Sequence, residues 1–327
     1  MPVLHVRIPP DEAGQRLDRW LKTRFPGFGW PRLQKMLRRG EIRVDGKRAR
    51  PDTRLPAGAD VRLPPALAAW QEQREKGAPA VLLPEEQRFF DSLVLYEDDW
   101  LMVLNKPAGL PVQGGSGTAR HLDMYLAALA ARHGARPRLA HRLDRDTSGV
   151  LVVAKSRRVA ADLGRLFASR AVSKTYWALT HGAPRPRQGV IDAPLVKVRT
   201  REGEHMAVPD HLPPGAKIID KPQNAKTRYN VLRATADERI AWLSLKPVTG
   251  RTHQLRVHLA HIGHPIVGDP RYGGLKNLPA GIEKKLHLHA RRLIFPHPVT
   301  EQCMDITAPL PPHMQKALRA LNLGEAT

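Results

Sequence analysis

The chain has 327 residues, 42% of them hydrophobic, which is enough for about two globular domains of ~100–200 residues each. Lysine and arginine number 53 against 31 acidic residues, and the net charge of +22 favours a polyanionic partner such as nucleic acid or an acidic membrane. The single cysteine, Cys303, excludes an intrachain disulfide framework, and no apolar run reaches the ~18 residues of a transmembrane helix. Because the first residues also lack the apolar core of a signal peptide, we expect a soluble cytoplasmic protein.

Residues 14–65 predict a small separate domain that begins with two helices. Leu17 and Leu21 lie four residues apart, as on one face of a first helix. Pro31 suits the first turn of a second helix, and Gly40 suits its end.

A hairpin and a cluster of basic residues follow. Residues 41–44 alternate like a strand, and Asp45-Gly46 is typical of a tight hairpin turn. Two short helices and a hairpin, together with the stretch 37–47, resemble the S4 RNA-binding domain. The resemblance implies that basic side chains of this domain contact RNA, namely Arg32, Lys35, Arg38, Arg39, Arg43 and Lys47. The alternative is a solvated basic face without a partner.

A linker and a larger domain are expected next. Residues 66–91 are rich in Ala, Gln, Glu and Pro and predict a linker that could include a partial helix. The larger domain is expected over 92–327, with early strands at 93–97 and 101–105. Strand and helix patterns then mix without regular βαβ repetition, which favours an α+β domain over a doubly wound parallel sheet.

A polar loop before an apolar strand is the first candidate for a catalytic site. Residues 150–154 form a continuous apolar run, as in a buried central strand. Directly before it, residues 141–149 (His-Arg-Leu-Asp-Arg-Asp-Thr-Ser-Gly) place two acids and two arginines where scaffolds often carry function. A purely structural turn would explain Asp146 but would leave Arg142 and Asp144 without a purpose.

This loop resembles the signature of the RluA-type pseudouridine synthases. Four further blocks resemble that family in its order: 173–176, 250–258, 263–269 and 286–290. The resemblance implies an RNA-modifying isomerase that needs no cofactor. It also implies a domain of pseudouridine synthase type, α+β, with a mixed and largely antiparallel sheet.

The resemblance also implies roles for single residues. Asp144 would be the essential carboxylate, Arg256 its charge partner, and Tyr176 the ring against the target base. The substrate would also be bound by Arg142, Lys174, Leu288, Arg251 and His253. Asp144 could trap positive character at C1′ as a nucleophile or remove a ribose proton as a general base, and the sequence leaves both open. Without the resemblance, Tyr176 would be interpreted as a sheet-packing tyrosine and Arg256 as a surface residue.

Neither a metal nor a nucleotide cofactor is expected. His253, His258, His261 and His264 are close in sequence, but their spacing matches no zinc motif, and one cysteine excludes a thiolate-rich site. The run Gly114–Gly117 lacks the Gly-Lys-Ser/Thr ending of a P-loop, so a turn or a backbone cradle for an RNA phosphate is predicted there.

Two branches of the family compete for the substrate assignment. Residues 11–16 and 105–109 resemble the RluC type, which implies uridines of large-subunit (23S) ribosomal RNA, whereas 260–274 resembles the sister RluD type. We expect the protein to be a monomer that binds this RNA and does not bind membranes. The sequence leaves open which uridines it modifies. A non-catalytic RNA-binding or ribosome-assembly protein is the rival, but it would not need Asp144, Tyr176 and Arg256 together.

Overall fold

The structure is a computed structural model, and it describes residues 3–25, 28–77, 82–112, 120–130, 136–169, 171–201, 203–276 and 278–324. It divides into two compact units, Met1–Leu82 and Leu83–Thr327. Within the described ranges, no helix combines the length and the apolar character needed to cross a bilayer. The predicted turn or phosphate cradle at Gly114–Gly117 lies outside the described residues.

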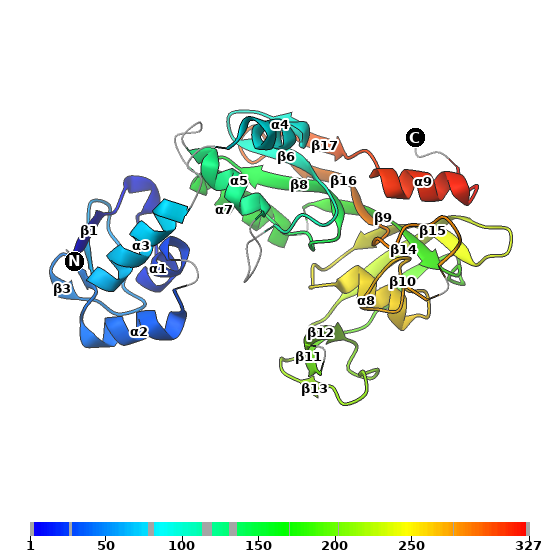
Figure 1. Ribbon diagram of the computed structural model, residues 1–327, viewed down its shortest axis with the longest axis horizontal. Coiled ribbons are helices and arrows are strands. Elements are labelled where there is room, and N and C mark those ends of the chain that lie inside the picture. The colour runs from blue at the N-terminus through cyan, green and yellow to red at the C-terminus, as the bar shows by residue number, and fades with distance from the viewer. Residues whose placement is uncertain are drawn as a thin grey trace. The chain divides into compact units, whose positions relative to one another are not determined.

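The first unit packs helices against a small antiparallel sheet. In chain order its elements are β1 (Leu4–Arg7), the 3-10 helix η1 (Pro10–Glu12), α1 (Leu17–Arg24), α2 (Trp30–Arg39), β2 (Arg43–Val44), β3 (Lys47–Arg48), β4 (Asp60–Leu63) and α3 (Pro65–Gly77). The strands pair in the order β1-β4-β2-β3. Figure 1 shows this unit with its helices α1, α2 and α3.

Buried leucines on one face explain the two predicted helices of this unit. Leu17 and Leu21 of α1 and Leu33 and Leu37 of α2 are at most 3% exposed. Each pair lies one helical turn apart and packs its side of the helix into the core. Gly40 has the left-handed conformation (φ 69°) with which helices commonly end. Both helices are therefore confirmed.

The hairpin after α2 is also confirmed, but its first strand is shorter than predicted. Asp45 and Gly46 both have positive φ, 47° and 74°, as a type I′ turn requires. The strand begins at Arg43 and not at Glu41, because Glu41 still donates its N–H to the carbonyl of Met36 and so completes the end of α2.

The second unit contains a large sheet with helices on both of its faces. Its elements are α4 (Pro84–Ser92), β5 (Val94–Glu97), β6 (Leu101–Lys106), α5 (Leu122–Ala128), β7 (Arg138–Leu139), β8 (Ser148–Ala154), α7 (Arg157–Ala168), β9 (Ser173–His181), β10 (Gln188–Asp192), β11 (Val196–Thr200), β12 (Gly203–Ala207), β13 (Lys217–Ile218), β14 (Lys226–Ala234), β15 (Ile240–Pro247), α8 (Gln254–His261), β16 (Leu288–Pro296), β17 (Cys303–Thr307) and α9 (Pro312–Ala320). The segment predicted as a linker therefore contains helix, since α3 covers its first part and α4 its last.

The large sheet is mixed and mostly antiparallel, as the sequence predicts. Its strands follow the order β10-β14-β15-β9-β16-β8-β6-β5, with β17 paired to β16 and β7 paired to β8. Strands β8 and β16 form a parallel pair, in which Ser148 lies opposite His289 and Gly149 opposite Ala290. Strands and helices are not arranged as repeated βαβ units, so the domain belongs to the α+β class.

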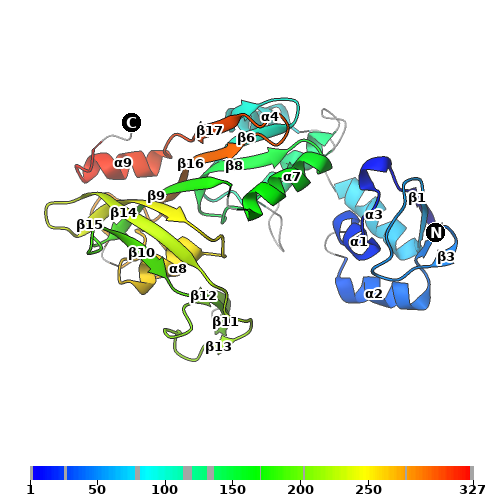
Figure 2. The same ribbon diagram turned by 180° about the vertical axis from the view of Figure 1, so that it is seen from behind.

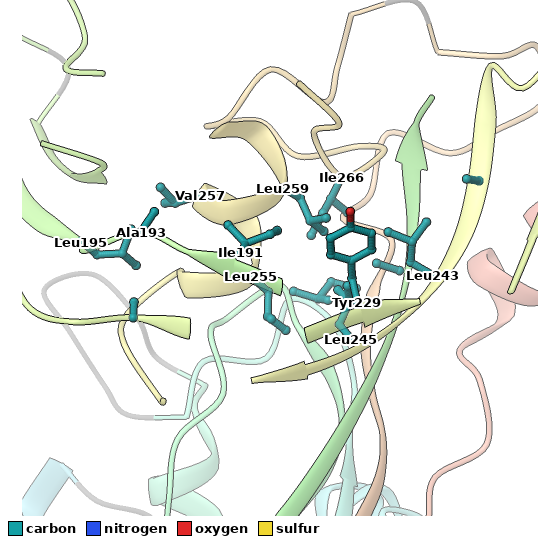
Figure 3. Close-up of a cluster of buried hydrophobic side chains, with 14 of the residues drawn as sticks. Ile191, Ala193, Leu195, Tyr229, Leu243, Leu245, Leu255, Val257, Leu259 and Ile266 are labelled. Carbon is teal, nitrogen blue, oxygen red and sulfur yellow. The ribbon is translucent and has the colours of Figure 1, made fainter. Parts of the chain in front are cut away.

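Alternation along β15 divides the core between two helices. Leu243 and Leu245 pack with Leu255 and Leu259 of α8, whereas Trp242 packs with the apolar residues of α9. Figures 1 and 2 show α8 and α9 on opposite sides of β15. Figure 3 shows the α8 side of this core, with Tyr229 of β14 and Ile191 of β10 beside the same leucines. Helix α8, which carries Arg256, is thus anchored by its apolar face.

Strand β8 is the buried central strand that the sequence predicts. All seven of its residues are buried, and it pairs with β6 on one side and β16 on the other. Val150 and Val152 pack against Val159 and Leu163 of α7. The loop that precedes β8 therefore ends at a rigid, buried strand.

A small sheet is inserted between β10 and β14, and the sequence did not predict it. Strands β11, β12 and β13 pair in the order β12-β11-β13 around a core of Val196, Val198 and Ala207. Met206 of β12 packs against the α8 core, so this small sheet lies next to α8 (Figure 1).

Candidate active site

Asp144 lies in the loop between β7 and β8, and the pairing of β8 fixes one end of that loop. Thr147 donates its N–H to the carbonyl of Asp144 at 3.2 Å and closes a turn. Gly149 has a φ of 113°, and a Cβ at this position would lie 2.2 Å from the carbonyl oxygen of Ala290. Only glycine therefore allows β8 to approach β16 this closely just after the acidic loop.

A buried lysine at the end of β6 holds the other side of the loop. Lys106 is 0% exposed, and its ammonium donates to three main-chain carbonyls, those of Pro107 at 2.9 Å, Leu110 at 3.0 Å and Arg145 at 2.8 Å. Burial lowers the pKa of Lys106 to about 7, although nearby carboxylates oppose the shift. Three acceptors match the three protons of an ammonium group, so Lys106 binds the residue that follows Asp144.

Arg256 of α8 reaches toward Asp144 but has a closer partner. Its Nη1 lies 3.8 Å from Oδ2 of Asp144, whereas Nε and Nη2 donate to the carboxylate of Asp269 at 2.7 and 2.8 Å. Burial opposes the charge of Arg256, but the hydrogen bonds and the charge of Asp269 outweigh it and raise the pKa of Arg256. The predicted pairing with Asp144 is therefore the longer of two ion pairs.

Tyr176 of β9 belongs to the same group. Burial, and next the negative charge of Asp144, raise the pKa of Tyr176 far above its ordinary value. The ring packs against the apolar core beneath α8. Tyr176 lies opposite Ala290 of β16, which in turn lies opposite Gly149 of β8, so it is near the loop of Asp144. Two distant segments of the sequence, β9 and α8, thus bring side chains to this loop.

His253 and Tyr272 complete the group. His253 precedes α8 in a left-handed conformation (φ 52°), and its Nε2 lies 3.9 Å from Oδ2 of Asp144. Its Nδ1 is hydrogen-bonded to the hydroxyl of Tyr272 at 2.8 Å. The guanidinium carbon of Arg256 lies 5.2 Å from the centroid of the Tyr272 ring. Burial lowers the pKa of His253, which favours the neutral form of its ring.

Comparison with known proteins identifies the family. The family described as RNA pseudouridylate synthase matches residues 100–261. Ribosomal large subunit pseudouridine synthase C of Salmonella typhimurium strain LT2 and that of Escherichia coli strain K12 are each 39% identical over 326 residues, covering 97% of this chain and 96% of theirs. The protein of the same name from Vibrio cholerae is 37% identical over 325 residues, covering 97% of this chain and 96% of its own. The chain belongs to the RNA pseudouridylate synthase family.

Solved structures agree with this assignment. Human RNA pseudouridylate synthase domain containing 4 superimposes with a TM-score of 0.59 at 32% identity, covering 72% of this chain and 95% of its own. Human RNA pseudouridylate synthase domain containing 1 gives a TM-score of 0.53 at 28% identity, covering 72% and 96%. The protein is thus an RNA pseudouridine synthase with the fold of this family, and the rival of a non-catalytic RNA-binding protein is set aside.

The other residues that were predicted to bind the substrate are Leu288, Lys174, Arg142 and Arg251. Leu288 is 3% exposed at the start of β16 and packs in the core that supports Tyr176. Lys174 places its Nζ 5.0 Å from the Phe167 ring centroid, and burial lowers the pKa of Lys174. Arg142 and Arg251 are exposed, and Arg251 donates from Nε to the carbonyl of Asn224 at 3.2 Å. In the part of the chain that the structure describes, Lys174, Arg142 and Arg251 give no hydrogen bond or ion pair to Asp144.

Three residues of the site were missed by sequence reasoning. Asp269, Tyr272 and Lys106 lie in blocks that were used only for their family resemblance. A sequence signal did exist for two of them, because Asp269 and Lys106 each end an apolar run where an unpaired charge would be costly. Their partners lie far along the chain, so no spacing rule could have named them.

A hollow lies beside the residues that lead into α8. It has a volume of about 330 Å³ and is lined by Leu195, Lys197, Met206, Asp220, Gln223, Gly250, Arg251 and Thr252.

The histidines that are close in sequence form hydrogen bonds within the protein. His258, for example, is hydrogen-bonded to Thr227 and to the carbonyl of Ala193. Among the described residues, no three His, Cys, Asp or Glu side chains are placed to share a metal ion.

Proposed function

We propose that this synthase isomerises specific uridines of large-subunit ribosomal RNA, with Asp144 as the essential carboxylate. The substrate assignment is supported by the names of its relatives, ribosomal large subunit pseudouridine synthase C, which match 97% of the chain. The assignment of Asp144 rests on one observation, the convergence of Asp144 with Arg256 and Tyr176 from separate segments.

The reaction exchanges one bond to the ribose for another. The bond between N1 of uracil and C1′ breaks, the base turns, and C5 joins C1′, while the proton on C5 is lost and N1 gains one. A carboxylate beside C1′ can act as a nucleophile or can remove a ribose proton. Either role needs the ionised carboxylate, and Nη1 of the Arg256 cation lies 3.8 Å from its Oδ2.

The surrounding side chains would hold the flipped uridine. Tyr176 keeps its phenolic proton near neutral pH, because burial raises its pKa, so it can lie against the base as an uncharged ring. Leu288 would extend the apolar support beneath it. Arg142, exposed two residues before Asp144, and Arg251, at the edge of the hollow, would contact the RNA backbone, with Lys174 and His253 nearer the base.

We further propose that residues 14–65 form an S4-like RNA-binding domain, joined by residues 66–91 to a catalytic domain at 92–327. Support comes from α1, α2 and the following hairpin, which have the expected order. All six candidate RNA contacts are exposed: Arg32, Lys35, Arg38, Arg39, Arg43 and Lys47. A hollow of about 630 Å³ lined by Gln34, Leu37, Arg38, Arg48, Ala49, Arg50 and Pro51 adds further cationic surface. Such groups suit phosphates and give affinity more than sequence choice.

The test is a complementation experiment with Asp144→Asn. Pseudouridines are mapped by carbodiimide treatment and primer extension in ribosomal RNA from cells that lack the protein and from cells that carry the wild type, Asp144→Asn or Asp305→Asn. Wild type and the surface variant Asp305→Asn should restore the same large-subunit sites, and Asp144→Asn should restore none while still binding RNA. Restored sites with Asp144→Asn would overturn the catalytic assignment, and lost sites confined to other RNAs would overturn the substrate.

A further inference from the structure

Two groups approach the same oxygen of Asp144. Nη1 of Arg256 lies 3.8 Å from Oδ2, and Nε2 of His253 lies 3.9 Å from that same atom. A carboxylate that two groups approach at Oδ2 can meet the substrate with Oδ1.

The hydroxyl of Tyr272 determines which nitrogen of His253 carries the proton. This hydroxyl accepts a hydrogen bond from the N–H of Met206 at 3.3 Å and lies 2.8 Å from Nδ1 of His253. Burial raises the pKa of Tyr272 to about 12, so the hydroxyl keeps its proton, and Nδ1 is the acceptor available to it. If Nδ1 carried the ring proton instead, the hydroxyl would accept twice and its own proton would have no acceptor within the described ranges, which is unfavourable at this half-buried position.

The neutral ring of His253 then has its proton on Nε2, directed at Asp144. Its left-handed backbone at the start of α8 gives the ring this direction. The N···O distance of 3.9 Å exceeds that of a hydrogen bond, but catalytic contacts in the absence of substrate are often long and tighten when it binds.

The loop that carries Asp269 and Tyr272 positions both groups that face Asp144, namely Arg256 and His253. The carboxylate of Asp269 binds Arg256 and also accepts the main-chain N–H groups of Arg271 at 2.9 Å and Tyr272 at 3.3 Å. The ring of Tyr272 lies against Arg256, and its hydroxyl binds His253. A shift of this loop would move both partners of the carboxylate together.

We infer that His253 and Tyr272 form a positioning pair: the tyrosine hydroxyl fixes the tautomer in which His253 directs its Nε2–H to Oδ2 of Asp144, so that Oδ1 meets the target nucleoside. This inference rests on the proposed function, because it takes Asp144 as the reacting carboxylate. It adds the orientation of the carboxylate to the place of His253 near the base, and it gives Tyr272 the same task through His253.

Two replacements of His253 separate this role from a structural one. Asparagine is tolerated in a left-handed conformation and keeps a polar atom near Nδ1, but it has no donor at the position of Nε2. Glutamine is longer and can place its amide donor near that position. We expect His253→Asn to lower kcat by about 10- to 100-fold with little change in KM, and His253→Gln to restore most of that loss.

A third variant removes only the hydroxyl that fixes the tautomer. Tyr272→Phe keeps the ring against Arg256, and we expect a fall in kcat of about 10-fold or more with little change in KM. Tyr229→Phe is the matched control, since the hydroxyl of this buried tyrosine donates to the carbonyl of Pro186, an exposed residue, and it should leave kcat unchanged. All variants are compared with the wild type on one large-subunit RNA transcript, with thermal unfolding to verify that each is folded.

The outcomes distinguish the two proposals. A wild-type protein that forms no pseudouridine in this transcript contradicts the proposed function. With an active wild type, equal rates for His253→Asn and His253→Gln would show that only the backbone conformation matters, and the inference would be wrong. Wild-type kcat in Tyr272→Phe, or effects confined to KM, would overturn it as well.

Discussion

Asp269 binds the guanidinium of Arg256 through two parallel hydrogen bonds, of 2.7 Å to Nε and 2.8 Å to Nη2. Both side chains are almost completely buried, at 0% and 3% exposure. This fork-to-fork geometry uses two of the three guanidinium nitrogens and leaves Nη1 for Asp144. Arg256, which faces the carboxylate of Asp144, is therefore held in place by a second carboxylate, that of the fully buried Asp269.

Asp269→Asn should destabilise the synthase strongly. The amide cannot balance the charge of Arg256, and breaking a buried ion pair from one side costs about 3–5 kcal/mol. The free energy of unfolding is measured by urea titration, and pseudouridine formation, which should also fall, is measured below the unfolding transition. The matched control is Asp305→Asn, whose bidentate partner Arg292 is 48% exposed, and there the loss should stay below about 1 kcal/mol. Equal losses in the two variants would contradict the buried role of Asp269.

Lys106→Met should loosen the loop that carries Asp144. Methionine has a similar length but leaves three buried carbonyls without their donor, at a cost of about 1–3 kcal/mol for each unsatisfied group before relaxation. We expect a loss of several kcal/mol in the free energy of unfolding and a lower rate in the folded fraction. Lys226→Met, which removes a half-exposed ion pair with Asp192, is the control and should change stability by less than about 1 kcal/mol. A variant as stable as the wild type would show that Lys106 does not hold the loop.

Whether an element or a contact could be predicted from the sequence depended on how far apart its interacting residues lie along the chain. The helices at Leu17 and Leu33, the turn at Asp45 and the buried strand β8 depend on neighbours within a few residues, and all four were predicted. Strand Arg43–Val44 was overestimated because Glu41 completes the preceding helix through a main-chain bond that no side-chain pattern encodes.

Contacts between distant segments were predictable only through family resemblance. Asp144, Tyr176 and Arg256 were placed together by motif matching, whereas Asp269 was not paired with Arg256, since nothing in the spacing of 13 residues indicates a contact across a loop. The three-stranded sheet of residues 196–218 was missed for a related reason. Its core has few residues, and charged side chains between them weaken the alternating pattern.

Buried histidines predict a loss of stability in weak acid. His287 and His289 are 0% exposed, and burial lowers the pKa of each to about 4. In the unfolded chain each ring takes up a proton near pH 6.5, so between about pH 6.5 and 4 the unfolded state binds more protons. The free energy of unfolding should therefore be full above about pH 6.5 and fall as the pH drops, by at most about 3 kcal/mol for each ring.

The control for this prediction removes one titrating ring. His287→Asn keeps a donor for the carbonyl of Lys285 but cannot take up a proton, so the slope of unfolding free energy against pH should decrease. The measurement is urea unfolding at several pH values from about 7 to about 4.5, and an unchanged slope in His287→Asn would show that this ring already titrates normally in the folded state.

The basic cluster of the first unit predicts how RNA affinity depends on salt. If the protein neutralises ~6–10 phosphates, affinity should fall by about 10³- to 10⁵-fold between about 50 and 200 mM salt. The triple variant Lys35→Gln, Arg38→Gln, Arg39→Gln removes exposed cations of α2 and should reduce the slope of log affinity against log salt by about 1 for each lost phosphate contact. Lys284→Gln, Lys316→Gln, Arg319→Gln lowers the net charge equally at exposed positions near the C-terminal end. If both triples reduce the slope alike, general charge and not a local phosphate-binding surface governs affinity; a reduction confined to the first supports the RNA-binding role of residues 14–65.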